Sequence, residues 1–518
     1  MTFFLAISPL LIVLVGILGL KKPAMKVAPV ALLWTLVLAF TIFNVKGLSF
    51  AENVNIIDGL LWKGIKEGLK IVWMVFGAFV ILNILRTTGA IEDVKHTIAK
   101  ISDDRRVQVV VIGLMLPIFL EGAAGAGAPA AIAAPFLVAL GVNPVTAIVV
   151  ALMGDSTPVS WGGAGLTTIV GGGALTSTGL STVDLNSSMV GRIHMFAVML
   201  LPFLMIALTY GRKGFRNAVP FLLFSGFTTA FWMFVLSNFV GAEVTSLGTG
   251  LLSIVTVIAY LKVVGINTPD EYRYHFTPAN GERFAPWQAL SPYLYMLVLL
   301  PTIRYGVPAL VPDGFKLMCT FGYIVWVDCV IMVCGVLGAF TLGLGLPKLL
   351  EIYKQTSAAV MPVLLTMGSL LIVAYIMQSP STGMIQLLAH HLADVAGVFY
   401  PAAAVAIGAG GAFVTGTGLG SNIMFADMHI HAAQTLNANP ITIFAGQNAG
   451  ASLGNMICPN NTVAACATVG QVNNEHKVMK ETVLVFSIIL GLYMTLAMLY
   501  TYVLFPELRF ELIRLGDN

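Results

Sequence analysis

The sequence predicts an all-helical membrane protein that crosses the bilayer about 12 to 14 times. Of its 518 residues, 58% are hydrophobic and 10% are charged, whereas soluble domains carry about 25% charged residues. Windows of about 20 apolar residues, the length of a membrane-spanning helix, recur along nearly the whole chain. Two glycine-rich interrupted segments, one in each half, further predict two structural repeats with broken or re-entrant helices, which we expect to be inverted in the membrane.

The first apolar run, Phe3 to Leu20, is expected to be a true first transmembrane helix. No basic region precedes it and no small-residue cleavage pattern follows it, as a signal peptide would require. Lys21 and Lys22 come next, and a later loop holds Arg212 and Lys213. Because loops rich in lysine and arginine tend to be cytoplasmic, the N-terminus is expected outside.

Charged segments indicate where the chain leaves the apolar layer. Ile57 to Lys70 and Ala90 to Ile101 have the spacing of amphipathic helices that lie at the membrane interface. The charges from Asp103 to Arg106 predict contact with water. The long polar connection from Asn267 to Gln288 is expected to divide the two halves, because such loops are uncommon within a compact unit.

Short sequence matches indicate an internal repeat. The tetrapeptide Asn143–Thr146 (NPVT) is echoed by Asn439–Thr442 (NPIT), an offset of 296 residues, and the same offset aligns Gly154–Ser156 with Gly450–Ser452. Gly122 and Gly418 also align at this offset, and three matches in one order are less expected by chance than one. The predicted organisation is peripheral helices (1–50), a first repeat (51–262) interrupted at 121–163, a polar loop (263–292), connecting helices (293–348) and a second repeat (349–518) interrupted at 411–460.

The segment from Glu121 to Pro158 is the centre of the functional prediction. Its first fifteen residues contain eleven glycines or alanines and two prolines, and glycine costs about 1 kcal/mol and proline about 3 kcal/mol in a helix. Such a run at membrane depth is expected to line a cavity, with free helix ends that favour an anion. Gly122 and Gly125 would let the backbone approach a ligand. The alternative is that these small residues only allow helices to pack closely.

Two acids in this segment, Glu121 and Asp155, are candidates for proton coupling. A carboxyl group at membrane depth is costly to keep charged and can take up or release a proton as its access to water changes. The alternative for each is a structural ion pair or a place at the interface. Arg192 is expected to be an interface anchor, or less readily a partner for a carboxylate substrate.

Neutral hydrogen-bonding groups gather in the second interrupted segment and beside Asp155. They are suited to orienting carboxylate and hydroxyl oxygens. The candidate substrate-binding residues are Gly122, Gly125, Ser156, Thr157, Thr415, Gly416, Ser421, Asn422, Gln447, Asn448 and Ser452. Asp427, His429 and His431 do not have the spacing of a familiar metal site and are expected in an interfacial turn, and we expect neither a metal nor a cofactor.

Several of these motifs resemble the signature of the bacterial L-lactate permease family. The first runs from Phe119 to Gly125 and continues through Pro129, Ala131–Pro135 and Asn143–Pro144; the second is Phe413–Gly416 with Ser421, Asn422 and Phe425. The resemblance implies import of lactate, glycolate or related 2-hydroxymonocarboxylates with protons across the bacterial inner membrane. It also implies that Glu121 is the family's intramembrane glutamate, and that Gly122, Thr415, Gly416, Ser421 and Asn422 occupy its hairpin positions.

The chain departs from this family pattern in two places. Thr417 to Gly420 replaces an expected Ser-Asp-Thr-Ser and loses an acid, whereas Asp155 to Pro158 replaces an expected Asn-Thr-Ala-Pro and gains one. Either the acid has moved from one repeat to the other across a shared site, or the substrate is a different carboxylate.

Together these features predict a proton symporter for a small 2-hydroxymonocarboxylate such as L-lactate, D-lactate or glycolate, and not an enzyme. Sodium coupling is the main alternative, because Asp155, Ser156, Asn448 and Ser452 could form an oxygen site; a membrane-embedded enzyme and a channel are less well supported. The expected partners are the substrate anion, H⁺ and the lipid bilayer, with a homo-oligomer possible and no nucleic acid. The expected location is the inner membrane, with a periplasmic N-terminus.

Overall fold

The computed structural model describes the chain except for residues 1, 21, 23, 45–48, 100–101, 126–127, 274–282, 304–309, 311–322, 472–473 and 507–518. In the described residues every regular element is a helix, and the one β contact is an isolated bridge between Asp104 and Arg273. The all-helical prediction is therefore confirmed. Part of the predicted polar loop at 263–292 lies outside the described residues, and the domain boundaries stay a prediction.

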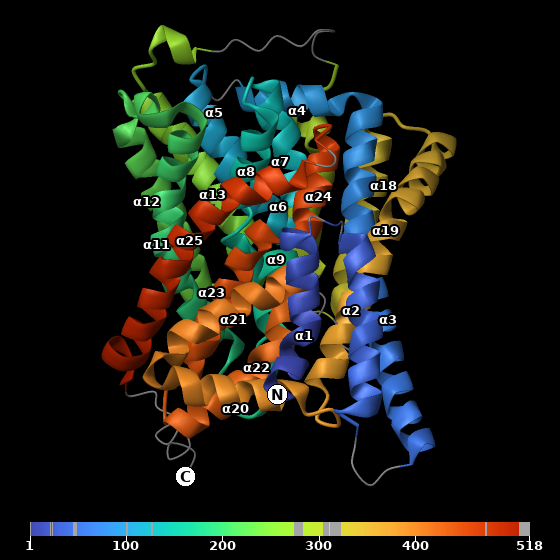
Figure 1. Cartoon of the computed structure of the whole chain (residues 1–518). Helices are drawn as coiled ribbons and strands as arrows, with labels where there is room; N and C mark the ends of the chain where they lie inside the picture. Colours follow the sequence, from blue (N-terminus) through green and yellow to red (C-terminus); the bar gives the residue numbers. More distant parts are fainter. Residues whose placement is uncertain are drawn as a thin grey trace.

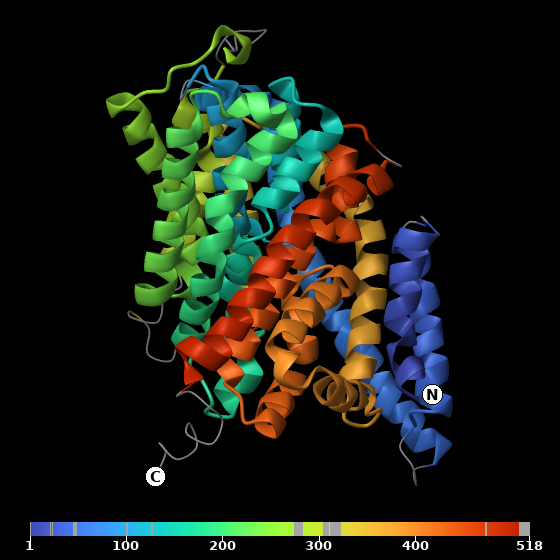
Figure 2. The same ribbon diagram turned by 60° about the vertical axis from the view of Figure 1, so that its left-hand side comes forward.

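The chain begins with a peripheral hairpin of α1 (Thr2–Leu14), the π-helical turn η1 (Val15–Gly19) and α2 (Ala24–Thr41) (Figure 2). The 39-residue α3 (Phe50–Thr88) follows, and Ser49 and Glu52 form a capping box at its start. We expected Ile57 to Lys70 to be a separate interfacial helix, but this segment is continuous with the span after it. No proline interrupts it, so the helix runs on for about 58 Å at 1.5 Å per residue.

The first repeat has a short helix at one end of the molecule, a re-entrant hairpin and a broken helix. Gly125, with φ +64°, ends the first hairpin arm, and Asn143 caps the broken helix by accepting a hydrogen bond from the Val145 N–H (3.0 Å). The elements are α4 (Ala90–Ala99), the first hairpin arm α5 (Arg105–Val110), η2 (Val111–Met115) and α6 (Leu116–Ala124), the second arm α7 (Ala128–Ala139), and the broken helix α8 (Pro144–Gly154), η3 (Pro158–Trp161) and α9 (Gly162–Ile169), followed by α10 (Gly173–Ser177).

The second repeat has the same order of elements, turned over in the membrane. α4 lies at the upper end in Figure 1 and α20 at the lower end, so the two repeats are inverted. Asn439 caps its broken helix as Asn143 does in the first repeat. The elements are α19 (Leu346–Gln378), α20 (Met384–Ala396), η7 (Gly397–Phe399), the hairpin α21 (Tyr400–Thr415) and α22 (Gly418–Leu436), the broken helix α23 (Pro440–Gly454), η8 (Asn455–Ile457) and α24 (Pro459–Thr468), then α25 (Glu475–Leu499) and η9 (Tyr500–Leu504).

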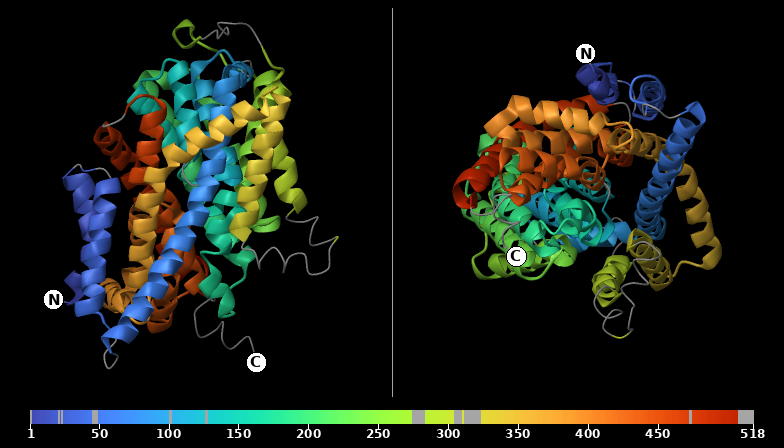
Figure 3. Two further views of the ribbon diagram at one scale, coloured as in Figure 1. Left: turned by 90° about the vertical axis from the view of Figure 1, so that its right-hand side faces the viewer. Right: turned by 90° about the horizontal axis from the view of Figure 1, so that it is seen from below.

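Long helices surround and connect these two units (Figure 3). By length and composition, five segments among the described residues could each cross a membrane: Val183–Phe215, Val219–Phe239, Ala242–Val263, Asp394–Phe413 and Glu475–Leu504. Several further apolar helices have only 10–17 residues, and two of them, Pro129–Val138 and Pro144–Gly154, belong to the first interrupted segment. The remaining helices are α11 (Val183–Tyr210), η4 (Gly211–Phe215), α12 (Val219–Phe239), α13 (Ala242–Val263), η5 (Asp270–Tyr272), α14 (Pro286–Ala289), α15 (Ser291–Pro301) and α18 (Tyr323–Thr341).

Corresponding glycines let each broken helix contact its hairpin closely. A Cβ at Gly154 would lie 1.8 Å from the Gly113 carbonyl oxygen, and a Cβ at Gly450 would lie 2.0 Å from the Val405 carbonyl oxygen. Gly113 belongs to the first hairpin arm of one repeat and Val405 to that of the other. The glycines aligned by the 296-residue offset thus have the same packing role.

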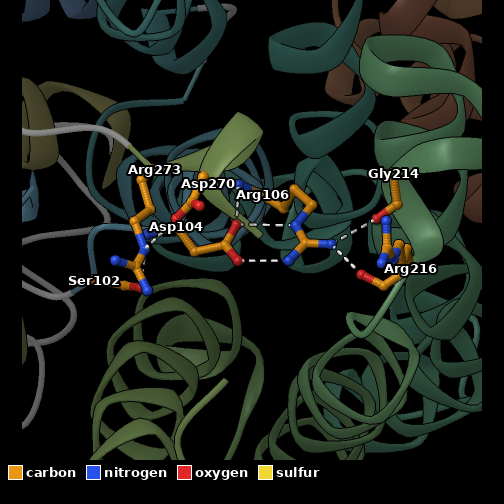
Figure 4. Close-up of polar contacts among 7 residues, drawn as sticks. All are labelled: Ser102, Asp104, Arg106, Gly214, Arg216, Asp270 and Arg273. Atoms are coloured by element: carbon orange, nitrogen blue, oxygen red, sulfur yellow. Dashed lines mark hydrogen bonds and ion pairs between the residues drawn. The ribbon is translucent and has the colours of Figure 1, made fainter. Parts of the chain in front are cut away.

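A buried ion pair ties the loops together at the upper end of the molecule (Figure 4). Arg106 and Asp104 are both fully buried and pair at 2.6 Å, and the Arg106 guanidinium also donates to the carbonyl oxygens of Gly214 (3.1 Å) and Arg216 (2.5 Å). Its cation lies 4.4 Å from the centre of the Tyr272 ring. The predicted contact of this charged run with water is wrong for Asp104 and Arg106. Both are buried, because the backbone at Gly214 and Arg216 and the Tyr272 ring pack against them.

Candidate functional site

The two broken helices meet at the points where each is interrupted. The Ser452 hydroxyl, on α23, donates to the carbonyl oxygens of Ser156 (2.6 Å) and Thr157 (3.2 Å), which lie between α8 and η3. Interrupting a helix frees backbone carbonyl groups, and here a side chain of the other repeat binds them. Ser156 and Ser452 are the residues that the repeat aligns, so the two halves contact each other through equivalent positions.

Glu121 and Asp155 form a pair of carboxyl groups at this junction. Each is 1% exposed, and the two carboxyl groups are close enough to interact electrostatically. Glu121 is in the last turn of α6, and a side chain at Gly162 would collide with its carboxyl group. Asp155 follows α8 directly, and its Oδ2 accepts a long hydrogen bond from the Asn455 amide (3.4 Å).

The surroundings of this carboxyl pair leave it without a positive counterion. Among the described residues, neither acid forms an ion pair, and Glu121 Oε2 and Asp155 Oδ1 have no hydrogen-bond partner. Of the two alternatives for these acids, a structural ion pair therefore disagrees with the described contacts, whereas a place at the interface stays an open alternative. Two adjacent carboxylates repel each other strongly where water is excluded, so the arrangement suits one shared proton.

Ser160 connects the first broken helix to its surroundings through all of its polar atoms. Its N–H donates to Ser452 Oγ (3.2 Å), its carbonyl oxygen accepts from Thr168 Oγ1 (2.6 Å), and its hydroxyl bonds to His194 Nε2 (2.8 Å). The other ring nitrogen of His194 bonds to the Tyr493 hydroxyl (2.6 Å). A buried chain of hydrogen bonds thus runs from the junction through α11 to α25.

The candidate residues of the second hairpin form a second network beside the junction. The side-chain amide nitrogen of Gln447 donates to Ser421 Oγ (3.0 Å) and, at 3.4 Å, to Asn422 Oδ1. The side-chain oxygen of Gln447, Oε1, bonds to His429 Nε2 (2.8 Å). The Asn422 amide donates to the Thr167 carbonyl oxygen on α9 (3.1 Å). This contact holds the hairpin against the broken helix of the other repeat.

The structure corrects the prediction that His429 lies in an interfacial turn. His429 is fully buried within α22, and its second ring nitrogen bonds to the Tyr400 hydroxyl (3.0 Å). Asp427 and His431, on the same helix, are exposed. Of the three residues, only His429 faces α21, the other arm of the hairpin, and it is therefore buried while the other two are exposed.

Three of the predicted ligand-facing residues serve the packing of the hairpins. A Cβ at Gly122 would lie 2.3 Å from the Leu247 backbone nitrogen on α13, which is the helix-packing role considered as the alternative. The Thr415 hydroxyl donates to carbonyl oxygens of its own hairpin, those of Gly411 and Thr417 (both 2.9 Å). Gly416, with φ +79°, makes the turn between the hairpin arms.

Arg192 also lies apart from the junction. Its Nε donates to Asn238 Oδ1 (2.9 Å), and its cation lies 5.4 Å from the Phe505 ring centre. Within the described part of the chain, neither contact involves a candidate residue, and the anchoring role stays a prediction.

Two further buried polar atoms at the junction lack a hydrogen-bond partner among the described residues. Thr157 Oγ1 and Asn448 Oδ1 have no hydrogen-bond partner within the described part of the chain, although the Asn448 amide nitrogen donates to Thr168 Oγ1 (2.9 Å). Unpaired buried polar atoms are costly and need an explanation. Over the same described ranges, no group of three or more His, Cys, Asp or Glu side chains is placed to hold a metal ion.

Sequence reasoning missed several members of this site. Ser160, Thr168, His194 and Tyr493 have contacts across the junction that no short motif encodes, since His194 and Tyr493 are 299 residues apart. Asn455 could have been noticed, because it lies three residues after Gly450–Ser452, the segment that matches the first repeat.

A family model described as L-lactate permease matches residues 2–310 and 290–505. The glycolate permease GlcA of Escherichia coli (strain K12) is 27% identical over 492 residues, which cover 83% of this chain and 85% of that protein. An L-lactate permease of Salmonella typhimurium is 27% identical over 516 residues, with 90% and 91% covered. Among solved structures, the chain is similar to the YdaH transporter of Alcanivorax borkumensis (TM-score 0.47, 16% identity, covering 91% of this chain and 98% of that chain).

Proposed function

The chain belongs to the L-lactate permease family, and from this premise we propose that it imports a small 2-hydroxymonocarboxylate together with a proton across the bacterial inner membrane. The relatives are named permeases, so the prediction that the chain is a multi-pass membrane transporter and not an enzyme is confirmed. The observation that carries the coupling proposal is the buried pair of Glu121 and Asp155, which has no positive counterion in the described structure.

A proton is the coupling ion that this pair suits best. Moving one negative charge inward against 100 mV costs about 2.3 kcal/mol, and one co-transported H⁺ makes the step electroneutral. Two adjacent carboxyl groups can bind one proton more readily than either would alone, because the neutral member can donate a hydrogen bond to the charged one. When the substrate carboxylate arrives nearby, its charge would further favour protonation of the pair.

Sodium remains the second candidate, because Glu121 Oε2 and Asp155 Oδ1 are unpartnered oxygen atoms. The other oxygen atoms predicted for such a site are less available. Ser452 Oγ bonds to the Ser156 carbonyl oxygen, and the Ser156 hydroxyl donates to the Met153 carbonyl oxygen (2.6 Å). A sodium ion requires several converging oxygen ligands, so these internal bonds favour the proton.

Substrate recognition is proposed for the two unpartnered neutral groups at the junction. The Thr157 hydroxyl can donate to a substrate carboxylate, and Asn448 Oδ1 can accept from a hydroxyl group. The named relatives carry L-lactate and glycolate, which share a carboxylate and a 2-hydroxyl group and differ by one methyl group. A site that pairs both polar groups would reject a carboxylate without the hydroxyl, because Asn448 would then stay unpaired.

The proposal is tested by uptake of labelled lactate and glycolate into proteoliposomes under an inward proton gradient. Glu121→Gln and Asp155→Asn are each expected to reduce accumulation to the level of protein-free vesicles, since each removes a proton-binding group. Exchange of labelled for unlabelled substrate at equilibrium, which needs no net proton movement, is expected to persist in at least one variant. Asp184→Asn, a change to an exposed acid at the start of α11, is the matched control.

Accumulation by both variants at the wild-type level would exclude the carboxyl pair from coupling. Stimulation by Na⁺ at constant pH, with no response to a pH gradient, would establish the sodium alternative. Equal competition by propionate and lactate would contradict recognition of the hydroxyl group by Asn448.

A further inference from the structure

An apolar groove lies in the peripheral hairpin of α1, η1 and α2. Its volume is about 500 Å³, within the about 300–1,000 Å³ of typical ligand pockets. Every residue that lines it belongs to this hairpin, and the exposed fractions of Leu11 (42%), Val15 (50%) and Val30 (54%) show that it is open at the surface. The hairpin stands at the edge of the molecule (Figure 3), and these side chains are exposed at its surface.

Three features of the hairpin set the shape of the groove. Gly16 lets the helices touch, since a Cβ there would lie 2.6 Å from Val27 Cγ1. The π-helical turn that contains Gly16 changes the direction of the side chains after α1. At the other end, the Trp34 indole N–H donates to Ser8 Oγ (2.7 Å) and joins the two helices.

One end of the groove is positively charged, and the rest of its lining is almost entirely apolar. Lys22 and Lys26 lie at the end where the chain turns from η1 into α2, and both are exposed. The remaining lining is apolar except for Ser8, and none of the described lining residues is acidic. A cationic end on an apolar channel is complementary to a phosphate group attached to an acyl chain, since a lysine ammonium binds phosphate as a point charge.

We propose that this groove is a binding site for an anionic phospholipid, with one acyl chain against Leu11, Val15 and Val30 and the phosphate on Lys22 and Lys26. A soluble anion would leave the apolar walls uncovered. A peptide would bury backbone groups against walls that offer few hydrogen bonds. The two lysines also belong to a loop that the distribution of basic residues assigns to the cytoplasmic side, where the membrane surface is rich in anionic lipids.

Native mass spectrometry of the full-length protein with added phosphatidylglycerol or phosphatidylcholine tests this site. The wild-type protein is expected to retain phosphatidylglycerol in preference to phosphatidylcholine. The double variant Lys22→Gln/Lys26→Gln is expected to weaken this binding by roughly 30-fold, since each lysine near an anionic surface strengthens binding roughly fivefold. Lys348→Gln/Lys354→Gln, which removes two exposed lysines of α19, is the matched control and is expected to bind like the wild type.

A second variant separates the groove from simple surface charge. Leu11→Trp fills the apolar channel and keeps both lysines, and it is expected to lose phosphatidylglycerol as the double variant does. Undiminished binding to this variant would overturn the proposal and assign the lipid to charge alone. Equal retention of the two lipids by the wild type, or equal loss in the α19 control, would overturn it as well.

Discussion

At the residue scale, the hydrogen bonds of Ser160 and His194 explain how a broken helix stays ordered inside an apolar protein. The break frees backbone groups that have no water to bind. The Ser160 backbone is held from the other repeat by Ser452 and from α9 by Thr168, and its side chain is held from α11 by His194. His194 is buried and has a partner on each ring nitrogen, including Tyr493 on the last long helix.

His194→Ala is therefore expected to lower the melting temperature of the purified protein. The change leaves the buried Tyr493 hydroxyl without its partner, and an unsatisfied buried group costs about 1–3 kcal/mol. His194→Gln, which can both donate and accept, is expected to restore part of the loss. His431→Ala, at an exposed histidine, is the control and should melt like the wild type; an equal melting temperature for His194→Ala would contradict a supporting role for this chain.

The two acids were predictable from the sequence because a carboxyl group in an apolar, glycine-rich segment is rare and costly. Their contact with each other was not, since Glu121 and Asp155 lie on different helices and no motif gives their distance. Gly122 shows the opposite difficulty. A dense run of glycines is equally consistent with a cavity wall and with close helix contacts, and only the position of Leu247 on α13 decides between them.

At the element scale, the two Asn-Pro pairs of the repeat match mark helix ends. Asn143 and Asn439, each followed by proline, cap the two broken helices in the structure, because an asparagine side chain accepts from free N–H groups and proline suits the first helical turn. The length of a helix is harder to predict from local sequence than its ends. The amphipathic spacing of Ile57 to Lys70 does not reveal that α3 continues beyond this segment as one helix.

Gly154→Ala tests whether the broken helix must touch its hairpin. The added methyl group would overlap the Gly113 carbonyl oxygen, and overpacking of a tight contact costs about 1–3 kcal/mol or more. Gly450→Ala, the equivalent change in the second repeat, is expected to have the same effect because it meets the Val405 carbonyl oxygen. The readouts are the yield of monodisperse protein and its melting temperature.

Gly491→Ala provides the matched control for these glycine changes. Gly491 lies within α25, and a Cβ there meets nothing within 4 Å. Alanine favours a helix by about 1 kcal/mol over glycine, so this variant should be as stable as the wild type or more so. If Gly154→Ala matched it, the close contact with Gly113 would not be needed for folding.

At the scale of the whole molecule, inversion of the repeats places equivalent elements on opposite faces of the membrane, and the charges then indicate which face is which. The upper end in Figure 1 includes Gly211 to Arg216, with three basic residues, whereas the lower segments 178–182 and 379–399 contain no lysine or arginine. The N-terminus lies at the lower end. The positive-inside tendency therefore predicts that the upper end is cytoplasmic and that α20 faces the outside.

Single cysteines in a cysteine-free background test this orientation. Val398, 64% exposed and next to α20, is expected to react as Val398→Cys with a membrane-impermeant maleimide on intact cells, because this segment faces outward. Lys213→Cys, in the exposed basic loop before α12, is expected to react only after the cells are permeabilised. The reverse pattern would place the basic loop at Gly211 to Arg216 outside.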